Sequence, residues 1–497
     1  MFYQKKQINV EILVFKLQRP KMSKLKNLVQ QLNQEEFYHL YNNLMDSSAD
    51  KSALLLKFLY EEKHTDDKMI KLLGVNANAY YTLRSRLNQK VEEYLVHEIV
   101  SPRAELITKV ASINEVVFTK SRILTIATLK KLEKDLLDYD LSNELTVVYK
   151  TLRSLHVGTE HNFFYSQQYN KHVAYMLSVD KAEYLLAEYF RKYGEYLFSN
   201  DANDKMALDL IHKEMKIVRK QYDSHRLYVY YGAMNIYHRF FVDTTETPED
   251  EPIEDMLTKI QGFFDSYLMD NAYHHLRVVF AYLRFEYYTF YKINRQSDEL
   301  YPLLLEEVTH LLSNYTLYTY PSRILYTIIE RSLRIKTEKD LANTNEKIFA
   351  DFEIEIDSTH YVNYMVYRAL SFYFAGQYAE SAKLLTKLMK KYPIKKSPIV
   401  ILEVRLLLGM QYALMKDEDL LAQLVSSLQR QARTVQKEMI PHISTMIKIL
   451  KLVSSGIDDT TKSRLDSLFV KLNKCERPLF CPTHYTNFEE KLKNLKS

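Results

Sequence analysis

Residues 123–138 read ILTIATLKKLEKDLLD, and the spacing of these side chains decides the fold class. Apolar residues recur at intervals of three and four, which is the period of an α-helix, and charged residues lie between them. The predicted apolar face consists of Ile123, Ile126, Leu129, Leu132, Leu136 and Leu137. In residues 206–221 the same spacing places four residues on one face: Leu208, Ile211, Met215 and Val218. Both segments therefore predict amphipathic helices.

The scarcity of glycine and proline extends this prediction to the rest of the chain. Only 8 of the 497 residues are glycine and 11 are proline, and residues 103–247 contain no proline. Strand-rich folds need a turn roughly every 8–12 residues, and glycine, proline and asparagine supply most of those turns. The predicted fold class is therefore all-α.

The positions of the glycines argue against an enzyme. Phosphate-binding loops and the nucleophile elbow need two glycines within about six positions, and the glycines of this chain lie much farther apart. The zinc-protease motif HExxH is also missing, because His97-Glu98 lacks the second histidine. We therefore predict no catalytic residue and no cofactor.

The charge and the cysteine count exclude further classes. A formal net charge of +5 is too small to indicate nucleic-acid binding by itself. Two cysteines, Cys475 and Cys481, are too few for a disulfide-rich secreted scaffold. Together with His484 they offer three metal-ligating side chains, but their spacing differs from that of structural zinc motifs. No metal site is predicted.

The N-terminus contains neither a signal peptide nor a membrane span by composition. Residues 1–21 lack a continuous apolar region, and no stretch of the chain approaches the ~18 apolar residues of a transmembrane helix. We interpret residues 1–21 as a non-native or disordered extension before a start at Met22. We expect a cytoplasmic protein without membrane contact.

Residues 362–395 indicate how the helices are arranged. A large apolar residue (Met365), a small one (Ala369), aromatic residues at 372–373, a Gly376-Gln-Tyr378 turn, Ser381 and a closing Pro393 follow one another in that order. This order resembles a tetratricopeptide repeat, although Arg368 occupies an apolar position and Ser381 replaces the usual alanine. The resemblance implies that helical hairpins stack into an α-solenoid. It also implies that the protein binds other proteins. The whole layout is also similar to that of all-helical bacterial proteins of about 500 residues. This similarity implies no known activity.

These patterns divide the chain into six predicted parts. They are the extension 1–21, an N-terminal helical domain 22–100, a helical repeat region 101–242, an acidic loop 243–255, tetratricopeptide-like repeats 256–474 and a C-terminal tail with a short helix 475–497.

Residues 66–90 resemble a helix-turn-helix. Met69, Leu73, Val75, Tyr80 and Leu83 have the core spacing of that motif around Gly74. The second helix would present side chains able to reach bases or phosphates, namely Asn78, Tyr81, Thr82, Arg84, Arg86 and Lys90. A plain helical hairpin explains the same spacing, and Ile70 occupies a position that usually takes a small residue. Both interpretations stay open.

Residues 273–291 are rich in tyrosine and suggest a binding face. Arg277, Arg284, Tyr288 and Tyr291 fall on one side of a helix and could line a groove that grips a peptide. Aromatic residues that fill the gaps between helices would show the same pattern.

The sequence predicts a non-enzymatic scaffold of helical repeats that binds a protein or peptide partner. The alternative is a DNA-binding regulator, in which the helix-turn-helix at 66–90 is paired with a helical-repeat sensor domain. The two predictions differ in whether the polar side chains of residues 78–90 contact DNA.

Overall fold

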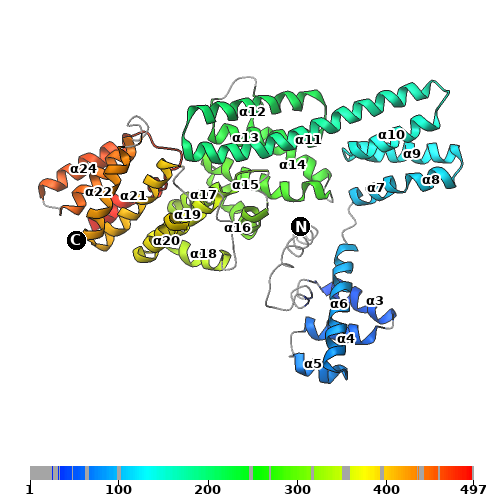
Figure 1. Cartoon of the computed structure of the whole chain (residues 1–497), viewed down its shortest axis with the longest axis horizontal. Coiled ribbons are helices and arrows are strands. Elements are labelled where there is room, and N and C mark those ends of the chain that lie inside the picture. Colours follow the sequence, from blue (N-terminus) through cyan, green and yellow to red (C-terminus); the bar gives the residue numbers. More distant parts are fainter. Residues whose placement is uncertain are drawn as a thin grey trace. The chain divides into compact units, whose positions relative to one another are not determined.

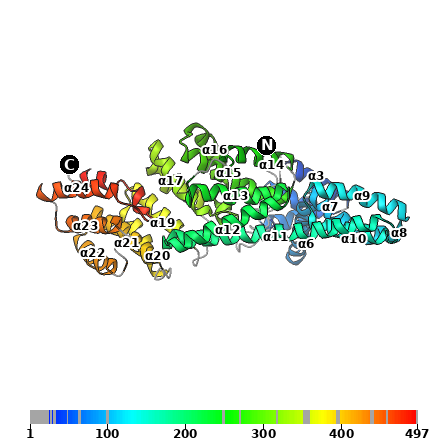
Figure 2. The ribbon, with the colours of Figure 1, turned by 90° about the horizontal axis from the view of Figure 1, so that it is seen from above.

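The structure of the chain is a computed structural model. It describes residues 25, 29, 32, 34–47, 49–61, 66–97, 102–245, 250–267, 270–314, 318–349, 359–391, 397–433, 435, 441–456 and 459–494. The predicted extension 1–21 lies outside these residues. Within them the chain forms 23 α-helices and no strand, which confirms the all-α prediction. Helices that follow one another in the sequence pack in pairs, an arrangement compatible with a helical repeat (Figures 1 and 2).

The chain divides into two compact units. Unit 1 consists of Met1–Asn162 and Tyr267–His274, and unit 2 consists of Phe163–Ser266 and His275–Ser497. The division therefore falls at positions other than the predicted domain boundaries, and a short segment of unit 1 comes from between two parts of unit 2 in the sequence.

The first four described helices of unit 1 enclose a hydrophobic core of their own. They are α3 (Gln34–Asp46), α4 (Asp50–Tyr60), α5 (Asp66–Leu73) and α6 (Ala77–His97). Leu56, Tyr80 and Leu87 have no exposed surface in this core, and Phe37 stacks on Tyr60 at its edge. The helical character predicted for the N-terminal domain is therefore present in its described part.

The next helices of unit 1 are α7 (Pro102–Ala111), α8 (Ile113–Thr119), α9 (Arg122–Asp138) and α10 (Ser142–Leu155). Helix α9 confirms the helix predicted for residues 123–138, but its buried face differs from the predicted one. The buried residues are Thr125, Leu129, Leu132 and Leu136, because α7 and α10 pack against that stripe. Ile123 and Leu137 are exposed, so these two assignments to the apolar face were wrong.

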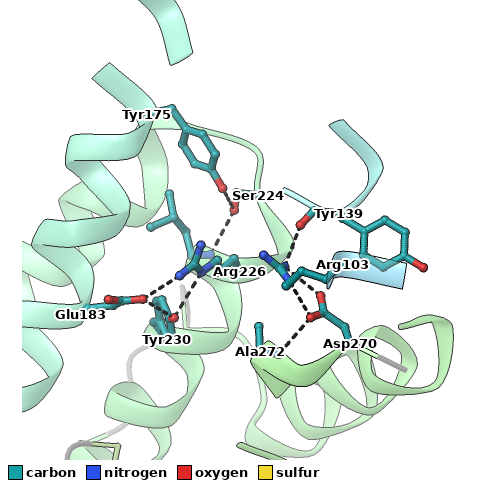
Figure 3. A network of polar contacts seen from close by, with 10 residues as sticks. Arg103, Tyr139, Tyr175, Glu183, Ser224, Arg226, Tyr230, Asp270 and Ala272 are labelled. Atoms are coloured by element: carbon teal, nitrogen blue, oxygen red, sulfur yellow. Dashed lines mark hydrogen bonds and ion pairs between the residues drawn. The ribbon is translucent and has the colours of Figure 1, made fainter. Parts of the chain in front are cut away.

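An ion pair fixes residues 267–274 in unit 1. The Arg103 guanidinium donates to both carboxylate oxygens of Asp270, at 2.6 and 2.8 Å, and also to the Tyr139 carbonyl at 2.9 Å (Figure 3). The Asp270 side chain is fully buried. Asp270 also accepts a bond from the Ala272 amide, at the 3-10 helix η1 (Asn271–Tyr273).

Unit 2 opens with four helices: α11 (His161–Ser199), α12 (Ala202–Gln221), α13 (His225–Phe241) and α14 (Ile253–Ser266). Helix α12 contains the predicted helix 206–221 and buries Leu208, Met215 and Val218. On α13, Arg226 and Tyr230 both donate to Glu183 of α11, at 2.8 and 2.6 Å (Figure 3). These bonds hold α13 against α11.

The described residues of the acidic loop 243–255 are bonded to neighbouring helices. Lys216 pairs with Asp250 at 3.3 Å, and the Tyr228 hydroxyl donates to Glu251 at 2.7 Å. Helix α14 begins at Ile253, so the last residues of the predicted loop are helical. Asp250 and Glu251 therefore hold the loop against α12 and α13.

The middle of unit 2 contains α15 (His274–Phe290), α16 (Asn294–Asn314), η2 (Pro321–Arg323), α17 (Ile324–Ile335), η3 (Glu338–Asp340), α18 (Leu341–Phe349), α19 (Thr359–Phe374) and α20 (Tyr378–Lys391). Helices α19 and α20 form the hairpin predicted from residues 362–395. Gly376 adopts a left-handed φ of 76° in the turn, as the sequence requires. Ser381 is buried and donates to the Ala369 carbonyl at 2.8 Å, so the two small residues lie at the closest approach of the helices. Pro393 lies outside the described residues.

The last part of unit 2 contains α21 (Pro398–Met415), α22 (Glu418–Ala432), α23 (Pro441–Ser454), α24 (Asp459–Lys474), η6 (Pro482–Tyr485) and α25 (Phe488–Asn494). Helix α21 is apolar on nearly all sides and packs against α20, α22 and α23. Among the described helices, α21 alone is long and apolar enough to cross a membrane, and 72% of it is buried inside the protein. Its neighbours account for its apolar character.

Candidate functional site

The helix-turn-helix-like hairpin is formed by α5 and α6. Gly74 adopts a left-handed φ of 60° between the two helices, and the Asn76 side chain accepts a bond from the Ala79 amide at the start of α6. Tyr80, Leu87 and Val91 of α6 face the core. The hairpin therefore exists, with a second helix of 21 residues.

The residues predicted to contact nucleic acid differ in exposure. Tyr81, Thr82, Arg86 and Lys90 are exposed on α6, and Arg84 is half-buried. The side chain of Asn78 lies outside the described part of the chain. Four of the six predicted side chains are thus accessible on one helix, and their contact with DNA stays a prediction.

The face predicted on α15 is partly used within unit 2. Arg277 donates to the Phe264 carbonyl at 2.9 Å, and Arg284 donates to the Leu257 carbonyl at 3.1 Å. Both arginines therefore hold α14 against α15. Tyr288 is half-buried, and Tyr291 is exposed one residue beyond the end of the helix. The role of these four residues in partner binding stays a prediction.

The C-terminal segment, which we define as residues 475–487, is the part of unit 2 that is most informative about function. It contains no α-helix among its residues and packs on helices from several hairpins. The Phe480 ring contacts Phe198 of α11, with 5.2 Å between the centroids. The Tyr485 ring stacks on Tyr326 of α17, with 5.1 Å between the centroids. Unit 2 thus accommodates a stretch of polypeptide whose regular structure is limited to the short 3-10 helix η6.

A cleft of about 360 Å³ lies beside this segment, and we call it the tyrosine cleft. Its aromatic lining comes from Tyr193, Phe240, Phe241, Tyr320, Tyr326 and Tyr485. The segment supplies one wall through residues Arg477–Cys481. Tyr320 donates to Thr359 at 2.8 Å, which fixes one ring in position.

The tyrosine cleft is also lined by Arg323, Glu330, Arg477 and the imidazole of His484. The Arg323 guanidinium lies 4.4 Å from the centre of the Phe241 ring, and its Nε has no hydrogen-bond partner among the described residues. Burial raises the pKa of Glu330, and Arg323 and a hydrogen bond with Tyr485 oppose this shift. Two arginines and one acid therefore line this cleft among aromatic and apolar side chains.

A second cleft, of about 420 Å³, lies on the other side of Arg477 and His484, which line both. His442 of α23 and Thr483 of η6 form part of its lining. These two residues also belong to a buried polar cluster, which we define as Glu403, His442, Cys481 and Thr483.

The polar cluster is connected by short contacts. Thr483 Oγ1 donates to Glu403 Oε2 at 2.9 Å and lies 2.9 Å from His442 Nε2. Cys481 Sγ lies 3.4 Å from the same nitrogen. Burial raises the pKa of Glu403 to about 8, raises that of the Cys481 thiol and lowers that of His442 to about 4. Burial thus disfavours the charged form of all three groups.

Neither the clefts nor the polar cluster could be predicted from spacing, because their residues lie far apart in the chain. Cys475, Cys481 and His484 are neighbours in the sequence, but the structure brings Cys481 to His442, 39 residues earlier, and to Glu403. Cys475 instead contacts Thr445, with Sγ 3.7 Å from the hydroxyl oxygen. Glu403, an acidic residue in the largely apolar α21, is the sequence signal that could have indicated this place.

Comparisons with protein-family models, with curated proteins and with solved structures found no match to this chain.

Proposed function

We propose that this protein is a non-enzymatic scaffold of tetratricopeptide-like helical hairpins that binds an extended peptide segment of a protein partner in unit 2. The observation that supports the proposal is the docking of its own C-terminal segment, whose Phe480 and Tyr485 rings pack on α11 and α17. A surface that holds one stretch without α-helix by inserted aromatic rings suits a second stretch laid beside it.

The tyrosine cleft determines the chemistry of the partner. Rigid aromatic rings give a large contact area at a low cost in conformational entropy, and arginine is enriched at the centres of binding surfaces. Arg323 and Arg477 favour a carboxylate, and Tyr193 and Phe241 favour an aromatic or aliphatic neighbour. We expect the partner to present an acidic residue next to an apolar one, in an extended conformation.

A peptide array tests this proposal with the full chain. Random 15-residue peptides on a membrane are probed with the purified protein, and bound sequences should be enriched in pairs of an acidic and an aromatic residue. Selected peptides are then titrated in solution by fluorescence anisotropy. Arg477→Glu, which reverses a charge in the cleft, should weaken binding about tenfold or more.

The matched control is Arg464→Glu, which makes the same charge change on an exposed position of α24 outside both clefts. It should leave the affinity unchanged. Equal affinities for the two variants, or an array without any preferred composition, would count against the proposal.

DNA binding by α6 is the second candidate function. It is supported by the exposure of Tyr81, Thr82, Arg86 and Lys90 on a helix that follows the left-handed turn at Gly74. Binding to duplex DNA should weaken steeply with salt, and the double change Arg84→Ala plus Arg86→Ala should abolish it. Duplexes that remain unbound at low salt would exclude this function.

A further inference from the structure

The polar cluster combines side chains that suit a metal ion. The carboxylate of Glu403, the imidazole of His442 and the thiol of Cys481 each place one ligand atom within 4.8 Å of the others. Cys481 Sγ is 3.4 Å from His442 Nε2, and Glu403 Oε1 is 3.8 Å from that nitrogen. A tetrahedral zinc ion separates its sulfur and nitrogen ligands by about 3.5 Å. The sulfur-to-nitrogen distance in the cluster matches this geometry.

One atom of the cluster points to a ligand independently of the spacing. Glu403 has no exposed surface, and among the described residues its Oε1 accepts no hydrogen bond. Burying a carboxyl oxygen without a partner is costly, because the bonds to water are lost and not replaced. A cation between Glu403 and His442 would satisfy this oxygen.

The charges of the three groups also suit a divalent ion in the interior. Zinc with one thiolate, one carboxylate and one neutral imidazole carries no net charge, so its burial avoids the main cost of burying an ion. Sulfur and nitrogen ligands favour zinc over magnesium or calcium. Thr483 Oγ1 or a water molecule would complete four ligands, and the cleft lined by His442 and Thr483 gives the ion a path of entry.

We propose that Glu403, His442 and Cys481 bind a zinc ion, which joins α21 and α23 to the C-terminal segment. The ion would crosslink parts of the chain that are remote in sequence, as structural zinc sites do. This inference does not depend on the proposed peptide binding, because it requires no partner.

Metal titration of the full chain tests the proposal. The protein is freed of metal with a chelator and titrated with cobalt(II), which replaces zinc in such sites and absorbs visible light. We expect one ion per chain, a thiolate-to-cobalt charge-transfer band and displacement of cobalt by zinc. Cys481→Ser should remove the band, and His442→Gln and Glu403→Gln should weaken binding about tenfold or more.

Cys475→Ser is the matched control, because it changes the other cysteine and should leave the band intact. X-ray absorption on the zinc-loaded wild-type chain needs no variant and should show one sulfur at about 2.3 Å from the metal. Failure of wild type to bind cobalt at micromolar concentration, a shell of nitrogen and oxygen alone, or loss of the band in Cys475→Ser would each overturn the proposal. The cluster would then be a hydrogen-bonded polar cluster only.

Discussion

The Thr483 hydroxyl donates a 2.9 Å hydrogen bond to Oε2 of Glu403, which lies 80 residues earlier in the chain and has no exposed surface. A contact of this kind requires the C-terminal segment to be part of the interior of unit 2. Because the segment also forms one wall of the tyrosine cleft, the cleft exists only when the segment is docked. The stability of this docking is therefore central to the proposed function.

Phe480→Ala should release the C-terminal segment. The ring is 2% exposed and packs on Phe198, and removing a buried aromatic ring typically costs about 3–5 kcal/mol. Hydrogen exchange of residues 475–487 should accelerate strongly in this variant. Leu479→Ala is the control, since Leu479 is 36% exposed and its change should cost at most about 0.5 kcal/mol. Equal exchange in the two variants would show that Phe480 does not anchor the segment.

Arg103→Ala should destabilise unit 1 by about 3–5 kcal/mol, because it leaves the buried carboxylate of Asp270 without its cation. Denaturant unfolding followed by circular dichroism measures the loss. The control is Arg295→Ala, which removes an exposed pair with Glu299 and should cost at most about 1 kcal/mol. A similar cost for both variants would contradict the role given to Asp270 in fixing residues 267–274.

Replacing glycine by alanine at two positions should change the stability of the protein in opposite directions. A Cβ at Gly262 of α14 meets no atom within 4 Å, so Gly262→Ala should raise stability by up to about 1 kcal/mol through helix propensity. A Cβ at Gly409 of α21 would lie 2.8 Å from Leu450 Cδ1, so Gly409→Ala should cost about 1–3 kcal/mol. Thermal unfolding gives the order of the two variants. An increase in the stability of the Gly409→Ala variant would contradict the close packing of α21 and α23.

Glu286 should make unit 2 less stable as the pH rises. Burial raises its pKa to about 7, from an ordinary value of 4.5, and Thr327 donates a 2.5 Å hydrogen bond to it. Its contribution is fully present below pH 4.5, and it falls as the pH rises toward 7, because the folded state holds a proton that the unfolded state releases. The loss is about 1 kcal/mol for each pH unit within that window.

Urea unfolding at pH 5 and pH 8 checks this prediction. Glu286→Gln cannot lose the proton, so its stability relative to wild type should increase between the two pH values. A constant difference between the two proteins would show that Glu286 titrates normally in the folded chain.

The sequence predicted the helices because their periodicity is local. The helix over residues 206–221 and the hairpin turn at Gly376 were both predicted from residues that are neighbours in the chain. The buried face of α9 was predicted less well, because Ile123 and Leu137 lie on a different side of the helix from the buried stripe of Thr125, Leu129, Leu132 and Leu136. The periodicity shows which faces of a helix could be buried, and the neighbouring helices determine which face is buried.

The clefts and the polar cluster could not be predicted in this way. Tyr193, Arg323 and Arg477 line one cleft although they come from three distant parts of the chain. No spacing in the sequence relates such residues, because the packing of helices from several hairpins sets their distances. The tyrosine-rich composition indicated that aromatic rings fill gaps between helices, but it did not indicate which gap stays open.

Site-specific photocrosslinking tests the central claim most directly, namely that a peptide binds in the tyrosine cleft. The change Leu479→p-benzoylphenylalanine places a photoreactive group on the wall of the cleft, and Leu420→p-benzoylphenylalanine places it on the exposed side of α22. With a peptide selected on the array, we predict a crosslink from position 479 and none from position 420. A crosslink from position 420, or from neither position while the peptide stays bound, would contradict the account.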